Sequence, residues 1–312
     1  MSKKIGIAAI GSYAPPKILS NADLEKMVDT TDEWITTRTG IKERRLADEN
    51  VHASDLATEA ARDCLSQTGL VPDLMISSCG TSERKFPYQA SIVANRMQLN
   101  GLPAFDLNAA CSGMVYAMAI TYSMIQTGPY RNGLITAAEK MSAFVDYKDR
   151  SSCILFGDAG SALLISTDNP EHEILDFELG TDTKGYNGVI MGGSGSEYYF
   201  WQDGKNLFKF AVGKMTDLVR SLYERSGEPD FQRLHIIPHQ ANSRIIDAAI
   251  ERTGIPAERF VCNIEKYGNT SSASIGLALK EAALAGRFAK GDTIILIGFG
   301  AGLSWAGAAL RW

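Results

Sequence analysis

The chain has 312 residues, of which 45% are apolar and 29 are glycine, and its net charge is −5 with an isoelectric point near 5.5. This apolar content is enough to bury a large core in one or two domains and excludes a disordered chain. The acidic balance excludes a general nucleic-acid binder, because neutralising phosphates requires clustered Lys and Arg.

The apolar stretch Ile5–Ile10 follows Lys3 and Lys4 directly and is too short and glycine-containing for a secretory signal. No run approaches the roughly 18 apolar residues of a membrane span. We therefore expect a soluble, cytoplasmic protein without a membrane partner. The five cysteines are odd in number and far apart, with no Cys-x-x-Cys pair, which predicts neither a disulfide framework nor a metal site.

Strand-like and helical patterns alternate along the chain. In order, they predict a helix at 21–27, a strand at 74–79, a helix at 87–97, a strand at 104–107 and a helix at 112–125. This alternation indicates an α/β fold. The helix at 112–125 has no polar face, so we expect it to lie between sheets, as the central layer of a sandwich.

A weak internal repeat relates Ile154–Ala162 to Leu296–Ser304 in their order of strand, glycine turn and strand. One such match is also compatible with chance. If the repeat is real, the chain consists of two similar halves, residues 1–170 and 171–312, with catalytic groups where they meet. Residues 180–204 have no clear period and are predicted to form a surface excursion.

Cys111 ends an extended segment and begins the apolar helix, so its sulfur should lie near a helix N-terminus, where the dipole favours a thiolate. The alternative is a small buried hydrophobic residue, which is the usual role of a free cysteine. Cys64 falls on an apolar helix face, Cys79 ends a strand, and Cys153 and Cys262 are predicted inside strands.

His239 ends the predicted strand 234–237, and ligands bind at such strand ends in open α/β sheets. Asn269 precedes another helix and is either an ordinary turn residue or an amide donor to the same pocket. His235 is predicted to be structural, and His52 and His172 to be exposed.

The glycines at 298, 300 and 302 follow a strand but lack the helix and lysine of a phosphate-binding loop, and Leu134 stands where the Gly128–Gly133 spacing would require lysine. We therefore exclude a nucleotide hydrolase. The turn at 298–302 is better suited to offer a backbone N–H to an oxyanion.

Taken together, these residues resemble one family over essentially the whole chain, the 3-oxoacyl-acyl-carrier-protein synthases III of the thiolase-like superfamily. The resemblance is carried by the segments 21–30, 32–35, 38–41, 108–113, 237–242 and 267–272. It implies a five-layer αβαβα sandwich of two similar halves, usually a homodimer. It also implies that an acyl-CoA starter is condensed with malonyl-acyl-carrier protein to begin fatty-acid synthesis, with no cofactor.

The resemblance also implies roles for particular residues. These are Cys111, His239 and Asn269 as the catalytic triad; the backbone N–H groups of Cys111 and Ala301 as the oxyanion hole; Trp34, Arg38, Arg150, Gly204, Phe208 and Asn242 for CoA; Lys209 and Arg244 for carrier-protein docking; and Phe86, from across the dimer, with Met141 for the acyl pocket.

Three departures from the family pattern stand out. Ala301 replaces the middle glycine of a Gly-Gly-Gly run, which is tolerable only if its φ is negative. Glu251–Arg252 replaces a pair of docking lysines. Arg84 and Lys85 add charge near the acyl pocket, where they either face solvent or pair with an acidic starter such as glutaryl.

Two other functions remain open from the sequence. One is a specialised relative that primes biotin, polyketide or signalling-molecule synthesis. The other is a non-catalytic module that binds acyl-CoA or a carrier protein, against which the intact triad argues.

Overall fold

The computed structural model describes residues 3–192, 199–228 and 230–312. Within these ranges the main sheet contains nine strands in the order β11 (Leu234–Pro238), β12 (Thr293–Gly300), β13 (Ser304–Arg311), β8 (His172–Thr181), β1 (Gly6–Tyr13), β7 (Asp158–Ser166), β6 (Asn132–Lys140), β4 (Leu74–Ser78) and β5 (Ala104–Leu107). β1 and β8 pair over two residue pairs only, Gly6 with Glu173 and Ile7 with His172. This short junction joins two sets of strands.

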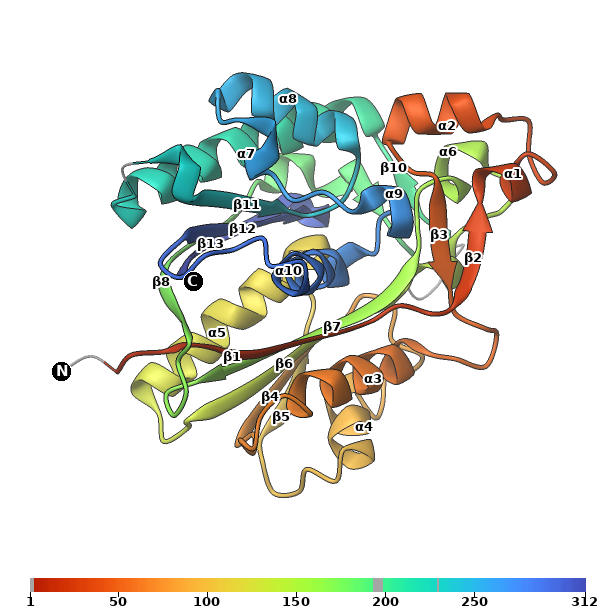
Figure 1. Ribbon diagram of the computed structural model, residues 1–312. Helices are drawn as coiled ribbons and strands as arrows, with labels where there is room; N and C mark the ends of the chain where they lie inside the picture. Colours follow the sequence, from red (N-terminus) through yellow and green to blue (C-terminus); the bar gives the residue numbers. More distant parts are fainter. Residues whose placement is uncertain (1–2, 193–198, 229) are drawn as a thin grey trace.

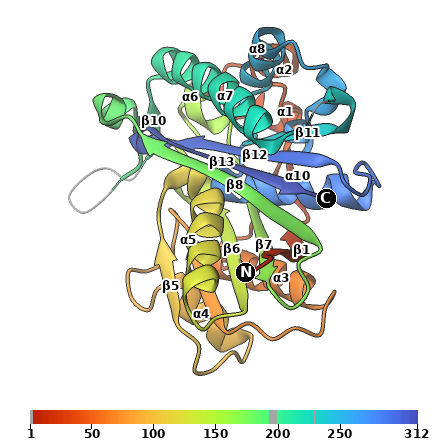
Figure 2. The same cartoon turned by 90° about the vertical axis from the view of Figure 1, so that its left-hand side faces the viewer.

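Figures 1 and 2 show five layers. From one side to the other they are helices α3 (Ala53–Leu65) and α4 (Gln89–Arg96); the strands β1, β7, β6, β4 and β5; helices α5 (Gly113–Thr127) and α10 (Ser274–Leu284); the strands β8, β13, β12 and β11; and helices α7 (Gly204–Ser226) and α8 (Ser243–Thr253). The predicted αβαβα sandwich is confirmed. None of the helices in the described ranges combines the length and apolar character that crossing a membrane requires.

Smaller elements border these layers. They are β2 (Lys17–Ser20), α1 (Asn21–Leu24), α2 (Asp32–Thr39), β3 (Glu43–Leu46), α6 (Arg150–Cys153), β9 (Val189–Ile190), β10 (Trp201–Gln202), α9 (Ile264–Tyr267), and the 3₁₀ turns η1 (Ala110–Ser112), η2 (Met141–Phe144), η3 (Thr183–Gly188), η4 (Phe231–Arg233), η5 (Ala257–Arg259), η6 (Ser271–Ala273) and η7 (Ala301–Leu303).

The two sets of strands repeat one pattern. β1, β7, β6 and β4 pair antiparallel, antiparallel and parallel, and β8, β13, β12 and β11 do the same. β5 extends the first set in parallel, and the parallel bridge between Ile236 and Phe260 takes its place in the second. The boundary expected near residue 170 lies between β7 and β8, and the division into two domains stays a prediction. The internal repeat predicted from Ile154–Ala162 and Leu296–Ser304 does not align the strands correctly. Ile154–Gly157 forms no strand, and β7 begins only at Asp158.

The central helices α5 and α10 are buried because most of their side chains are apolar. α5 contains no charged residue, as the missing polar face predicted. α10 carries Lys280, which is 8% exposed. Its ammonium donates to the Ile10 carbonyl at 2.8 Å and lies 3.3 Å from the Asp63 carboxylate, so the buried charge is paired and hydrogen-bonded.

Some local predictions were wrong. The first helix ends at Leu24 instead of Met27, because the N–H groups of Lys26 and Met27 bond three residues back, as in a tight turn. Cys153 ends helix α6, and Cys262 lies outside the strands. His172 is half-buried, because its ring stacks on Trp312 with centroids 3.5 Å apart.

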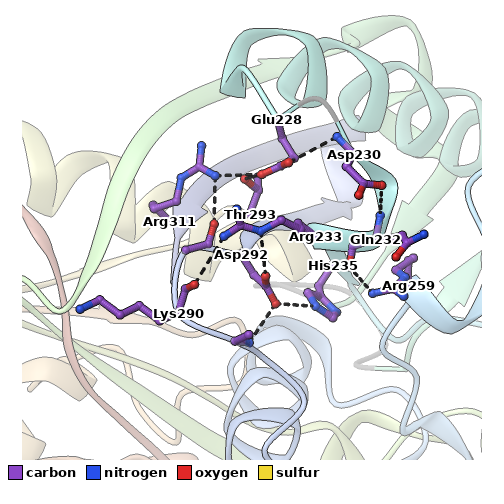
Figure 3. A network of polar contacts seen from close by, with 12 residues as sticks. Glu228, Asp230, Gln232, Arg233, His235, Arg259, Lys290, Asp292, Thr293 and Arg311 are labelled. Atoms are coloured by element: carbon purple, nitrogen blue, oxygen red, sulfur yellow. Dashed lines mark hydrogen bonds and ion pairs between the residues drawn. The ribbon is translucent and has the colours of Figure 1, made fainter.

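A polar network holds one end of β11, β12 and β13 together (Figure 3). It lies at the end opposite the turn η7, which connects β12 to β13. His235 Nε2 and Asp292 Oδ2 lie 3.1 Å apart, which fits the structural role predicted for this histidine. Arg311 donates to Glu228 at 2.9 Å, and Thr293 donates to the same carboxylate at 3.2 Å. These bonds link β11, β12 and β13 to the end of α7.

The packing of α3 on the sheet depends on Gly11. A Cβ at this position would overlap the Ala60 carbonyl oxygen and the Cys64 backbone nitrogen. We expect Gly11→Ala to lower the free energy of unfolding by about 1–3 kcal/mol, the usual cost of overpacking. Urea unfolding measures this, with Gly69→Ala as the control because Gly69 has open space around it. Equal stability of the two variants would contradict the packing argument.

Candidate active site

A cavity of about 520 Å³ is lined by residues from both sets of strands, among them Glu139 on β6 and Phe299 on β12. Cys111, His239 and Asn269 all line it, although they come from η1, from the loop after β11 and from the loop before η6. The cysteine and the asparagine each precede a central helix, and η1 packs against η6. The layered fold therefore brings the three predicted residues to one place.

The backbone of Cys111 lies directly against the end of β12. A Cβ on Gly300 would be 2.7 Å from the Cys111 nitrogen, and one on Gly298 would be 2.7 Å from the Ser112 Cα. Only glycine permits this approach, which puts the turn containing Ala301 beside the cysteine. Among the described residues, those other than glycine with a positive φ are Gln98, Ala110 and Ser271. The φ of Ala301 is therefore negative, as its extra methyl requires.

The Cys111 thiol differs from the sequence prediction. Burial raises its pKa to about 12, and the nearby Glu139 contributes in the same direction. A hydrogen bond to Ser271 Oγ, at 3.4 Å, acts the other way but does not outweigh burial. The helix N-terminus alone therefore does not yield a thiolate in the free protein, because the loss of hydration dominates.

His239 is buried and neutral. Its pKa falls to about 3 because burial disfavours the imidazolium. Ser274 Oγ accepts from the Gln240 N–H at 3.3 Å and lies 2.7 Å from His239 Nδ1. The Ser274 hydroxyl proton can therefore serve Nδ1, which favours the tautomer that carries its proton on Nε2.

Asn269 is fixed through both its backbone and its side chain. Its N–H donates to Leu155 O at 2.8 Å, and its carbonyl accepts from Gly157 N at 3.1 Å. Its Oδ1 accepts from Ser271 N at 2.9 Å, which sets the orientation of the amide. The amide nitrogen has no protein partner within the described residues and is available as a neutral donor to the cavity.

The residues expected to bind CoA fall into two groups. Gly204, Phe208 and Asn242 line the cavity. Trp34 lies outside it, with the guanidinium groups of Arg38 and Arg150 at 4.7 and 4.8 Å from its ring centroid. The two groups are connected, because the Asn242 amide donates to the Arg38 carbonyl at 3.0 Å.

The remaining predicted residues are placed as follows. Lys209 and Arg244 are exposed, and the Arg244 guanidinium lies 5.8 Å from the Phe208 ring centroid. Met141 lines the cavity, whereas Phe86 is 84% exposed and does not line it in the single chain. Their roles in carrier-protein docking and in the acyl pocket stay predictions.

Several lining residues were missed from the sequence. The segment 180–204 was expected to be only a surface excursion, but Tyr186, Val189–Met191 and Phe200 line the cavity; its residues 193–198 lie outside the described residues. The apolar residues of this segment could have indicated that it contacts the cavity. Asn108, Glu139 and Ser271 were missed too, although an acid that closes the buried strand β6 is an unusual residue.

Two layers of strands around apolar helices, with a thiol, a neutral imidazole and an amide in one cavity, define a thiolase-like acyltransferase. A family model described as 3-oxoacyl-[acyl-carrier-protein (ACP)] synthase III matches residues 105–183. A second model, described as the C-terminal part of the same enzyme, matches residues 232–312. The chain belongs to the 3-oxoacyl-acyl-carrier-protein synthase III family and is an acyltransferase of that type.

Individual relatives agree with this assignment. The chain is 42% identical to a β-ketoacyl-[acyl-carrier-protein] synthase III from Caldanaerobacter subterraneus, over 100% of this chain and 99% of the relative. It resembles the crystal structure of 3-oxoacyl-[acyl-carrier-protein] synthase III from Aquifex aeolicus with a TM-score of 0.93 at 41% identity, covering 99% and 100% of the two chains. A priming β-ketosynthase of the R1128 polyketide pathway gives a TM-score of 0.92 at 34% identity, covering 99% and 96%.

The raised pKa of Cys111 has a kinetic consequence. Because the pKa of about 12 lies far above neutrality, the thiolate fraction rises with every pH unit below it. We expect alkylation of Cys111 by iodoacetamide to speed up about tenfold per pH unit between pH 7 and 9. Peptide mass mapping separates this product from that of the exposed Cys262. A rate that levels off near pH 7 would contradict a protonated resting thiol.

Proposed function

We propose that this chain condenses an acyl-CoA starter with malonyl-acyl-carrier protein, releasing CoA and CO₂ and starting fatty-acid synthesis. The observation that carries the proposal is the meeting of Cys111, His239 and Asn269 in one cavity. A binding module has no need of a nucleophile beside two neutral donors. The full-length likeness to the synthase III family favours this reaction over a specialised priming role.

The first step is acyl transfer to Cys111. The sulfur forms a bond to the thioester carbon, and the bond from that carbon to the CoA sulfur breaks. The carbonyl oxygen becomes negative in between, and the backbone N–H groups of Cys111 and Ala301 donate to it. The glycines at 298 and 300 hold these two backbone segments close enough for a shared oxyanion hole.

The second step is decarboxylation of the malonyl group. The bond to CO₂ breaks and leaves an enolate, whose oxygen accepts from His239 Nε2–H and the Asn269 amide. A neutral histidine suits this role because its proton is available as a hydrogen-bond donor without a buried positive charge. The carbanion then attacks the acyl-Cys111 carbonyl, and the bond to sulfur breaks to give the 3-oxoacyl product; the Cys111 thiolate released takes up a proton from water.

The starter we propose is a neutral acyl group. Met141, Leu155, Phe156 and Phe200 give the cavity apolar walls, and its lining within the described residues contains no Lys or Arg. Arg84 and Lys85 are exposed and do not line this cavity in the single chain. This favours acetyl or a branched short chain over glutaryl.

The same scheme assigns the surroundings of the cavity. CoA lies along Asn242, Phe208 and Gly204, with Trp34, Arg38 and Arg150 at its adenine end, where an indole can stack and guanidinium groups can pair with phosphate. Lys209 and Arg244 dock the acidic carrier protein. The active form is a homodimer in which Phe86 reaches the partner's acyl pocket. The enzyme is cytoplasmic and needs no cofactor, since the chain and its substrates supply every group in both steps.

Variants of the triad separate the two steps. We expect Cys111→Ala to abolish acyl transfer from CoA. His239→Ala and Asn269→Ala should slow malonyl decarboxylation roughly 10²–10³-fold, the usual effect of losing one oxyanion donor, and affect acylation less. Intact-protein mass spectrometry follows the acylation, and CO₂ release follows the decarboxylation. His52→Ala is the control, because His52 is exposed. Equal losses in both steps would contradict the assigned roles.

A panel of CoA esters tests the starter. Acetyl-, isobutyryl-, octanoyl- and glutaryl-CoA are mixed separately with the enzyme, and the adduct is located by peptide mapping. We expect acetyl or isobutyryl to label Cys111 fastest, because the cavity walls are apolar and lack a cation. A preference for glutaryl or octanoyl would assign the enzyme to a specialised pathway. Labelling by none of the four would favour a binding module or a different donor.

A further inference from the structure

A buried carboxyl group lies beside the proposed nucleophile. Glu139, near the end of β6, is 1% exposed and lines the cavity. It accepts from Gly80 N at 3.0 Å, Thr81 Oγ1 at 2.7 Å and Ser272 Oγ at 2.8 Å. Within the described residues it pairs with no Lys, Arg or His. Burying a carboxylate without a cation beside it costs free energy, and such groups are often found at functional sites.

Ser271 connects this acid to Cys111. Its Oγ lies 3.4 Å from the Cys111 sulfur and 3.4 Å from Glu139 Oε1. Its backbone has a φ of 52°, which non-glycine residues seldom adopt, and its N–H is held by Asn269 Oδ1. An unfavourable backbone conformation maintained at an active site often serves to aim a group. Here it directs a hydroxyl between the thiol and the carboxyl.

The two acidic groups are electrostatically coupled. Burial raises the pKa of Glu139, and a Glu139 carboxylate raises the pKa of Cys111. Two anions this close in an enclosed site repel each other, so the pair favours a single negative charge. A proton that leaves the thiol is therefore best accepted by the carboxylate, which lowers the cost of forming the sulfur anion.

The other ionisable groups facing the pair are poorly suited to accept this proton. Cys79, at the end of β4, lies 3.8 Å from Glu139 and stays protonated because burial raises its pKa well above the usual value. Across the cavity, His239 has a pKa of about 3. Asp106, on β5, acts on Cys79 and does not line the cavity, and its carboxylate accepts from the N–H groups of Gln89 and Ala90.

We propose that Ser271 and Glu139 form the proton path of the acylation step, with Glu139 as the acceptor; this rests on the proposed function of the site. As Cys111 attacks the thioester, its S–H bond breaks and the proton passes to Ser271 Oγ. The hydroxyl proton of Ser271 passes to Glu139 at the same time. When the bond to CoA breaks, the proton returns to the CoA sulfur, so CoA leaves as a thiol and Glu139 is again a carboxylate.

Glu139→Gln tests the path because it should affect the alkylation and the acylation of Cys111 in different ways. Removing the negative charge lowers the pKa of the thiol, so alkylation of Cys111 by iodoacetamide at pH 7 should equal or exceed the wild-type rate. Removing the acceptor should slow acylation from the best CoA donor on the order of 10²-fold, as expected for loss of a general base. Both rates are measured by quenched reactions and intact mass, from pH 6 to 9.

Ser271→Ala provides a second variant. Alanine is compatible with this backbone, because Ala110 has a similar φ of 47°. We expect Ser271→Ala to slow acylation, and the double variant with Glu139→Gln to be no slower than the slower single variant, since both interrupt one path. The control is Ser123→Ala, because Ser123 is exposed on α5, does not line the cavity, and its hydroxyl donates to the Ala119 carbonyl in its own helix; it should acylate normally.

Three outcomes would overturn the path. Normal acylation by Glu139→Gln would exclude Glu139 as the acceptor. Parallel losses of alkylation and acylation, or additive losses in the double variant, would indicate a structural role. If wild-type Cys111 takes no acyl group from any CoA ester, the proposed function itself fails. If the wild type is labelled but the variants behave normally, only the proton path fails.

Discussion

The burial of α5 and α10 between two layers of strands is the constraint on which the site depends. α5 has no charged side chain, and the ammonium of Lys280 on α10 is satisfied by a carbonyl and a carboxylate. Helices of this kind are stable only where both sides are covered by apolar surface. Because each is preceded by a 3₁₀ turn, covering them also packs η1 against η6. Cys111 and Asn269 thereby enter one cavity.

The same enclosure controls the ionisation of the site. Loss of hydration raises the pKa of Cys111 and lowers that of His239, which favours the uncharged form of both groups. Burial also raises the pKa of Glu139, but the hydrogen bonds from Gly80, Thr81 and Ser272 act the other way and favour its carboxylate. The loss of hydration suits His239 and Asn269, which act as neutral donors in the proposed reaction. It is unfavourable for a thiol nucleophile, and the Ser271–Glu139 pair is the feature of this chain that can offset it. One physical effect thus gives both the electrostatic advantage and the need for a proton acceptor.

The sequence predicted the elements with strong periodicity and the three residues with distinctive neighbours. It found α4, β4, β5 and α5 to within a few residues, and it singled out Cys111, His239 and Asn269, which line one cavity. It missed Ser271, whose importance lies in its positive φ and in two partners that are 160 and 132 residues away along the chain. It also misplaced His172 and Cys153, because ring stacking and a short helix outweighed local pattern.

By itself, the sequence determined the alternation of strands and helices and the apolar character of the central layer, and it supplied the three candidate residues of the proposed triad, since these depend on residue type and spacing along the chain. The tertiary structure decided that Tyr186, Val189–Met191 and Phe200 line the cavity and how close β12 lies to Cys111. It also decided that Ser271 lies between Glu139 and the thiol and that burial raises the pKa of the thiol. Distances between remote segments and the loss of hydration arise only when the layers pack, because both depend on which surfaces exclude water from one another.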